Sequence, residues 1–137
     1  ALRDYEGLIA LLGIDFAVEP EAVEFTMTVG RRHLGGPGAA HGGAVMALMD
    51  TALGGRALVQ AVLRGKATST VEMKVNFLRP ARLGATLRVE TTLPSEGRSL
   101  LVVSGTAFDD AAGERVAFAV GTFNLYDADF EAALRGG

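Results

Sequence analysis

An aspartate interrupts an apolar segment that is long enough to form a helix of several turns. Between Gly42 and Leu63 the only charged residues are Asp50 and Arg56. Aspartate is a poor helix former, and burying its charge is costly unless a partner or a function compensates. Because a helix that is apolar on nearly every side is usually buried, we expect Asp50 to be buried. A carboxylate in such a place is a candidate general base or nucleophile.

A structural role is the alternative for this carboxylate. Asp50 could accept a hydrogen bond from a nearby hydroxyl, or it could pair with Arg56 further along the same helix. From the residues alone, a structural role is the commoner explanation of such a carboxylate.

Two glycines, Gly42 and Gly43, follow His41 at the start of the same segment. The first N–H groups of a helix have no intrahelical partner, and the helix dipole attracts negative charge to that end. A free N–H there could polarise a carbonyl and stabilise the oxyanion that forms on attack. The glycines could equally serve close packing or a sharp turn into the helix.

The spacing of Gly42 and Asp50 predicts that these two residues act from different chains. They are eight positions apart, which is roughly 12 Å along a helix. One carbonyl therefore cannot be held by the first residue and attacked with help from the second. Two antiparallel helices related by a two-fold axis would bring Gly42 of one chain near the aspartate of its partner. We therefore expect a homodimer with a shared site.

Hydrophobic periodicity indicates which elements position these residues. It predicts helices at 3–12, 42–64 and 127–134, and strands at 14–19, 22–29, 68–78, 86–92, 100–108 and 115–125. The glycine-rich residues 33–40 predict a loop without regular structure. Turn residues at 80–84, 94–97 and 109–113 predict hairpin connections between the last four strands. This order indicates the α+β class, with an antiparallel sheet on one central helix and a single domain spanning residues 1–137.

Composition limits the possible partners. The chain has 137 residues, a net charge of −3 and no cysteine, which excludes disulfides, a cysteine nucleophile and thiolate metal ligands. The basic residues are dispersed, which argues against a nucleic-acid partner. The first residues mix acids and bases, so we expect no secretory signal and a cytoplasmic location. Residues 44–63 have the length of a membrane span, but Asp50, Arg56 and Gln60 within them favour a core helix and no membrane association.

The segment from His41 through Asp50 resembles the helix signature of hotdog-fold acyl-CoA thioesterases. The resemblance is to the PaaI-like (phenylacetate-pathway) branch of the 4-hydroxybenzoyl-CoA thioesterase superfamily. It extends over roughly residues 25–125 and includes the stretches 68–81, 97–100 and 120–123. It implies the hotdog fold, in which an antiparallel sheet wraps around one long helix. It also implies homodimers that often pair into homotetramers.

The resemblance implies roles for individual residues. Asp50 would be the general base or nucleophile, the N–H of Gly42 would hold the oxyanion, and Thr70 would assist. We also expect His41 and Gly43 to contact the substrate, and Arg79 is a candidate for gripping the phosphates of CoA. No cofactor and no metal is expected, since His33 and His41 on either side of a glycine loop are a poor metal constellation.

One position departs from the family pattern. Family members usually carry an asparagine six residues before the motif histidine, and that position is Gly35 here. In the family this asparagine contacts the thioester or positions water, a role that another group would have to fill here. We consider His33 or a neighbouring group as a replacement.

The expected function is hydrolysis of small to medium acyl or aryl-acyl coenzyme A thioesters to the free acid and CoA. We expect Met46, Met49, Leu53 and a loop of the partner chain to set the depth of the acyl pocket. Two alternatives stay open. One is a hydratase or dehydratase acting on acyl thioesters, and the other is a non-catalytic acyl-CoA sensor, which the departure from the family pattern at Gly35 would favour. The chain has no serine-hydrolase elbow, P-loop or dinucleotide-binding motif.

Overall fold

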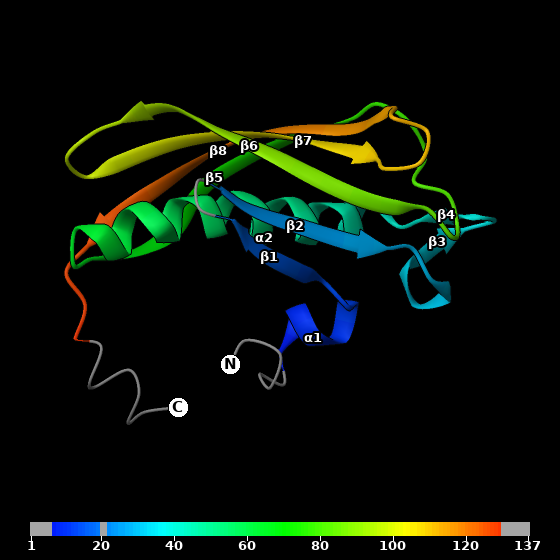
Figure 1. Cartoon of the computed structure of the whole chain (residues 1–137), viewed down its shortest axis with the longest axis horizontal. Coiled ribbons are helices and arrows are strands. Elements are labelled where there is room, and N and C mark those ends of the chain that lie inside the picture. Colours follow the sequence, from blue (N-terminus) through cyan, green and yellow to red (C-terminus); the bar gives the residue numbers. More distant parts are fainter. Residues whose placement is uncertain (1–6, 20–21, 130–137) are drawn as a thin grey trace.

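The computed structural model describes residues 7–19 and 22–129, and Figure 1 shows how its elements are arranged. The short helix α1 (Leu8–Leu12) leads into the strands β1 (Asp15–Glu19) and β2 (Ala22–Thr28). The 3-10 turn η2 (Arg31–His33) and the small strands β3 (Leu34–Gly36) and β4 (Ala39–Ala40) precede the long helix α2 (Gly42–Leu63). Four longer strands follow, namely β5 (Ala67–Phe77), β6 (Thr86–Glu96), β7 (Leu100–Asp109) and β8 (Arg115–Tyr126).

Six of these strands form one antiparallel sheet in the order β1-β2-β6-β7-β8-β5. The sheet lies against one side of α2, and α1 lies beyond β1 (Figure 1). The strands β3 and β4 pair only with each other. A sheet packed on a single long helix confirms the α+β class and the hotdog arrangement that the sequence predicted.

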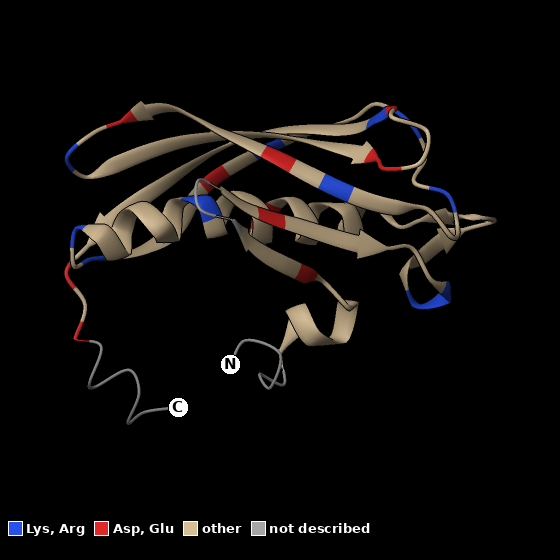
Figure 2. Cartoon of the chain, in the orientation of Figure 1, with Lys and Arg blue, Asp and Glu red and all other residues tan. Residues whose placement is uncertain are grey.

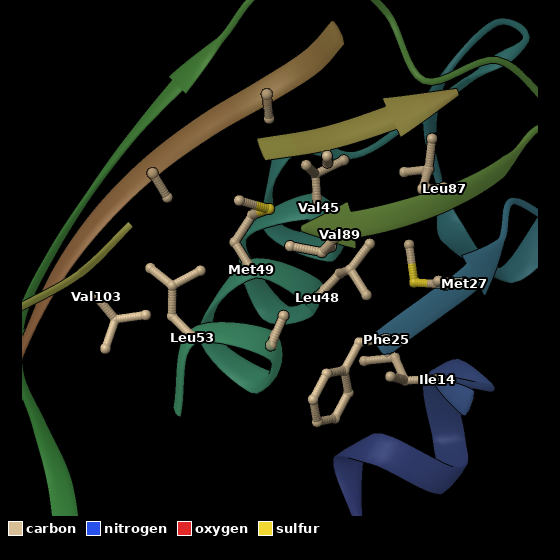
Figure 3. Close-up of a cluster of buried hydrophobic side chains, with 14 of the residues drawn as sticks. Ile14, Phe25, Met27, Val45, Leu48, Met49, Leu53, Leu87, Val89 and Val103 are labelled. Atoms are coloured by element: carbon tan, nitrogen blue, oxygen red, sulfur yellow. The ribbon is translucent and has the colours of Figure 1, made fainter. Parts of the chain in front are cut away.

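One side of α2 forms the centre of the core. Its buried residues recur at intervals of three and four positions, as one stripe of a helix must. Figure 3 shows these side chains meeting residues of β2, β6 and β7. The labelled members of this cluster are Ile14, Phe25, Met27, Val45, Leu48, Met49, Leu53, Leu87, Val89 and Val103. Burial of apolar surface in this stripe fixes which side of α2 faces away from the sheet.

The opposite side of α2 is open, and Met46, Leu58 and Val62 are exposed there. The expectation of a helix buried on all sides was therefore wrong for the single chain, because the sheet covers only one side. The length and hydropathy of α2 would also suit a membrane span. The packing of its apolar stripe against the sheet accounts for much of that hydropathy.

Two of the expected connections are different in the structure. Strand β5 pairs with β8 rather than with β6, so residues 78–85 cross between strands and do not form the predicted hairpin. Strand β6 continues through Pro94 to Glu96, with an irregularity in its pairing to β7 between Thr92 and Ser95. Proline has no N–H to donate. It is tolerated there because β2 pairs with β6 only as far as Val89, so no strand on that side needs a hydrogen bond from it.

The prediction of an irregular loop at residues 33–40 was also wrong, because most of this segment forms a small hairpin. Leu34 pairs with Ala40, and Gly36 pairs with Ala39 around the turn at Pro37-Gly38. Short strands rich in glycine lack the alternating pattern by which strands are recognised. At the chain ends, residues 127–129 have no regular structure, and the rest of the helix predicted at 127–134 lies outside the described residues, as do residues 3–6 of the helix predicted at 3–12.

Candidate functional site

Asp50 is an exposed residue of α2, and its side chain faces strand β5 at the edge of the sheet. The hydroxyl of Thr70 donates a hydrogen bond of 2.8 Å to Oδ1 of Asp50. The predicted burial of Asp50 was wrong for the single chain, since the residue is exposed. Its partner is the strand hydroxyl and not Arg56, which lies near Gln60 instead. The carboxylate is thus oriented by the chain itself and remains accessible.

A β-bulge at Val71 allows Thr70 to face the helix. Thr70 is opposite Phe123 and Glu72 is opposite Thr122, so Val71 is an extra residue in β5. Without it, Thr70 and Phe77 would point to opposite faces, because they are seven positions apart and side chains alternate along a strand. In the structure both reach α2: Thr70 bonds Asp50, and the ring of Phe77 lies against Gly42.

The first turn of α2 leaves one N–H group free. Nδ1 of His41 accepts a hydrogen bond of 2.8 Å from the N–H of Gly43, and the carbonyl of His41 accepts one of 2.9 Å from the N–H of Ala44. Within the part of the chain that the structure describes, the N–H of Gly42 has no acceptor. At the positive end of the helix dipole, Gly42 is therefore the available donor.

His41 is held between two glycines. A Cβ atom at Gly35 would lie 2.6 Å from the Cα atom of His41, and one at Gly43 would lie 2.9 Å from Nδ1 of its ring. Real Cβ atoms do not approach backbone so closely, and packed interiors resist the movement that would relieve the contact. The departure from asparagine at Gly35 is thus part of the local packing: no side chain fits there without displacing His41.

His33 does not replace that asparagine. It is only 2% exposed, and both ring nitrogens are used. Nδ1 accepts a hydrogen bond of 2.8 Å from the N–H of Gly30. Nε2 therefore carries the proton and donates to the carbonyl of Leu12 at 2.7 Å. His33 fastens the end of α1 to the turn before β3, so its role is structural.

Gly42 and Arg79 border the same open cavity of about 350 Å³ at the start of α2. Asp50 and Thr70 do not line it. Both residues lie on the continuous helix α2, where eight positions correspond to roughly 12 Å along the axis. One chain thus presents two separate partial sites, an oriented carboxylate and a free N–H beside a cavity.

Met49 and Leu53 cannot line an acyl pocket, because both are fully buried in the core. Of the three residues expected there, only Met46 is accessible, at 40% exposure. Phe77, which borders the cavity beside Gly42, was missed. An aromatic residue in a strand ordinarily indicates core packing, and the bulge that aims this one at α2 has no signal in the alternating pattern.

Charged residues lie both at the ends of the molecule and along the middle of its strands and of α2 (Figure 2). At the end where α2 begins, Arg79 is half exposed and lies 3.8 Å from Glu114. Such an exposed pair is weak, so the guanidinium is available to an anion. Among the described residues, no three His, Asp or Glu side chains gather as metal ligands would.

Comparison with known proteins identifies relatives that share this architecture. Residues 37–115 match the model of the thioesterase superfamily. The E. coli PaaI protein from the phenylacetic acid degradation operon superposes with a TM-score of 0.82 at 26% identity, covering 93% of this chain and 89% of that one. The BH2602 protein from Bacillus halodurans, whose structure was solved with CoA, gives a TM-score of 0.79 at 27% identity, covering 91% of this chain and 80% of that one.

One relative has a lower coverage. A Saccharolobus solfataricus protein named as an esterase is 37% identical over 89 residues. The match covers 65% of this chain and 57% of that protein, so it spans little more than half the length of this relative.

Proposed function

The chain belongs to the thioesterase superfamily, and we propose that it hydrolyses acyl-coenzyme A thioesters to the free acid and CoA. The hydrogen bond from Thr70 to Asp50 is the observation that carries this proposal. It holds an accessible carboxylate in one orientation, on the same helix that presents the free N–H of Gly42. A relative solved with CoA supports the choice of thioester.

Asp50 would activate the attacking water or attack the carbonyl itself. The hydroxyl of Thr70 occupies Oδ1, which leaves Oδ2 as the acceptor for a water proton. A positioned general base typically contributes about 10²- to 10⁴-fold to the rate. In this scheme Thr70 orients the base and the reaction needs no cofactor.

Gly42 would stabilise the oxyanion from the partner chain. Its N–H points from the positive end of α2, where developing negative charge is favoured. Since Gly42 and Asp50 of one helix cannot reach the same carbonyl, the complete site needs two chains. We propose a homodimer in which the two α2 helices lie antiparallel, and such dimers could pair again into tetramers.

The surroundings of Asp50 support this assembly. Strand β5 is at an edge of the sheet, so one side of its backbone is unpaired. Val71 on this strand is 60% exposed, and Met46 lies one helical turn before Asp50 on the exposed side of α2. Apolar side chains that flank an accessible carboxylate are suited to burial by a second copy of the chain.

The substrates would be small to medium acyl or aryl-acyl thioesters. The likeness to a protein from a phenylacetic acid degradation operon supports an aryl-acyl group. Arg79 borders the cavity beside the positive end of α2 and could pair with an anionic group of the substrate. His41 and Gly43 would position the oxyanion donor: the ring of His41 accepts the N–H of Gly43 and so caps the helix that presents Gly42.

Release of free thiol from a panel of acyl-CoAs tests this function. The panel runs from acetyl-CoA through phenylacetyl-CoA and hydroxyphenylacetyl-CoA to dodecanoyl-CoA. We expect turnover by the wild-type chain and a fall of kcat by about 10² or more in Asp50→Asn. The control is Asp110→Asn, an exposed carboxylate that bonds Arg88 and does not line the cavity beside Gly42. Wild-type activity in a folded Asp50→Asn protein refutes the assignment of the base.

Two other outcomes of this screen would replace the proposal. Hydration of an enoyl-CoA without thiol release would identify a hydratase. Binding of acyl-CoA without any turnover would identify a sensor.

A further inference from the structure

The cavity at the start of α2 has an apolar floor. Val45, Ala81 and Val116 line it and are buried. Phe77 and Leu78 form its wall and are 53% and 50% exposed, so they cover little of their own apolar surface. Large apolar side chains left open around a hollow generally mark a place where another apolar group binds.

Phe77 also touches the proposed oxyanion donor. The nearest atom of its ring would lie 3.3 Å from a Cβ atom at Gly42. The ring therefore lies beside the glycine, and both residues border the cavity. A group bound in the cavity would be held between this ring and the apolar floor.

Apart from the free N–H of Gly42, several backbone groups around the cavity are already hydrogen-bonded. The carbonyl of Val116 accepts from the N–H groups of Leu78 and Arg79, at 2.8 and 3.2 Å, and the carbonyl of Ala81 accepts from Ala40 at 2.8 Å. Burying an amide without a partner is costly. The pantetheine arm of CoA contains two amides, whereas the hydrocarbon part of an acyl group needs no hydrogen bond. The cavity suits the acyl side of the thioester.

We infer that this cavity binds the acyl group and that Phe77 determines which acyl groups fit. The inference rests on the proposed thioesterase function. The volume of about 350 Å³ is near the lower end of the roughly 300–1,000 Å³ that ligand pockets span. The preferred substrates are therefore compact, and an aryl-acyl group has the further advantage of an edge-to-face contact with the ring of Phe77.

The test compares kcat/KM for phenylacetyl-CoA and dodecanoyl-CoA in the wild-type chain and in Phe77→Ala. We expect the wild type to favour phenylacetyl-CoA. Removing the ring should shift the ratio of the two constants toward the long chain by about tenfold or more, since even one methylene in an apolar pocket discriminates by roughly 10- to 200-fold. The matched control is Phe118→Ala, a partly exposed phenylalanine opposite Asn76 in the sheet. It should leave the ratio unchanged.

Each result decides the question. An unchanged ratio in an active Phe77→Ala protein overturns the inference and leaves the thioesterase function intact. An equal loss for both substrates also overturns it, because Phe77 would then only support Gly42. A change from dimer to monomer in Phe77→Ala, measured by light scattering, would show that the ring contacts a second chain instead. Absence of thiol release by the wild type with every acyl-CoA refutes the proposed function itself.

Discussion

The hydroxyl of Thr70 lies 2.8 Å from Oδ1 of Asp50, although the two residues are twenty positions apart on different elements. The contact joins strand β5 to the exposed side of α2 within a single chain. The carboxylate is thus oriented before a partner or a substrate arrives, which reduces the reorganisation needed during reaction.

Replacing Thr70 with valine should slow catalysis while the fold is kept. Valine has nearly the shape of threonine but cannot donate to Asp50. We expect kcat to fall about tenfold or more, because each 1.4 kcal/mol of lost orientation is tenfold in rate. KM should change little. Thr70→Ser, which keeps the hydroxyl, should retain most of the activity, and equal kcat values for the valine and serine variants would contradict an orienting role.

Two inactive variants should restore activity when they share a dimer. Asp50→Asn removes the base, and Gly42→Pro removes the N–H at a position where proline is tolerated. Each heterodimer would carry one site with both lesions and one intact site. After joint refolding, thiol release should recover to about one quarter of the wild-type value if dimers form at random.

Gly42→Ala is the control for this experiment, since alanine keeps the N–H and adds only a methyl group 3.3 Å from the ring of Phe77. Because that ring must shift by a few tenths of an ångström, Gly42→Ala should retain more activity than Gly42→Pro but less than the wild type. A verified heterodimer without activity would show that the site is not shared and that the oxyanion donor lies elsewhere.

Restoring the family asparagine at Gly35 should harm the protein. Its Cβ atom would lie 2.6 Å from the backbone of His41, so Gly35→Asn should lower the free energy of unfolding by about 1–3 kcal/mol, as overpacking does. Thermal denaturation measures the change. The neighbouring Gly36→Ala is the matched control, because nothing lies within 4 Å of the added atom. A Gly35→Asn protein as stable as the wild type would mean that the hairpin before α2 adapts.

Deleting Val71 should turn the side chains of one half of β5 away from α2. Without the bulge, Thr70 and Phe77 cannot both face α2, so we expect kcat to fall at least as far as in Thr70→Val. Val71→Thr keeps the extra residue and its β-branched shape, and should remain active. Full activity after the deletion would show that the strand forms a bulge at another position.

The long elements and the fold class were predictable from sequence because they repeat apolar residues at regular intervals. Helix α2 shows this in Leu48, Met49, Ala52 and Leu53, and β2 shows it in Phe25 and Met27. Periodicity also predicted correctly that Gly42 and Asp50 lie on one helix. It could not show what covers that helix, so the exposure of Asp50 was missed.

Features that depend on distant contacts had no such signal. The pairing of β5 with β8 arises from packing over the whole sheet, and the Val71 bulge only appears against its partner strand. The absence of a side chain at Gly35 looked like a lost functional group in the sequence. Its physical reason is the closeness of His41, which no local pattern reveals.

The open backbone edges of the sheet differ in their capacity to recruit another chain. The unpaired end of β6 is interrupted by Pro94 and by its irregular pairing, and β1 has only five residues. Strand β5 offers eleven residues without a proline. Although the bulge at Val71 interrupts its regular pairing, β5 would give an extended strand from another molecule a longer template than the other described edges of this sheet. The fold therefore steers association toward the edge beside Asp50 and away from open-ended polymerisation through the other edges.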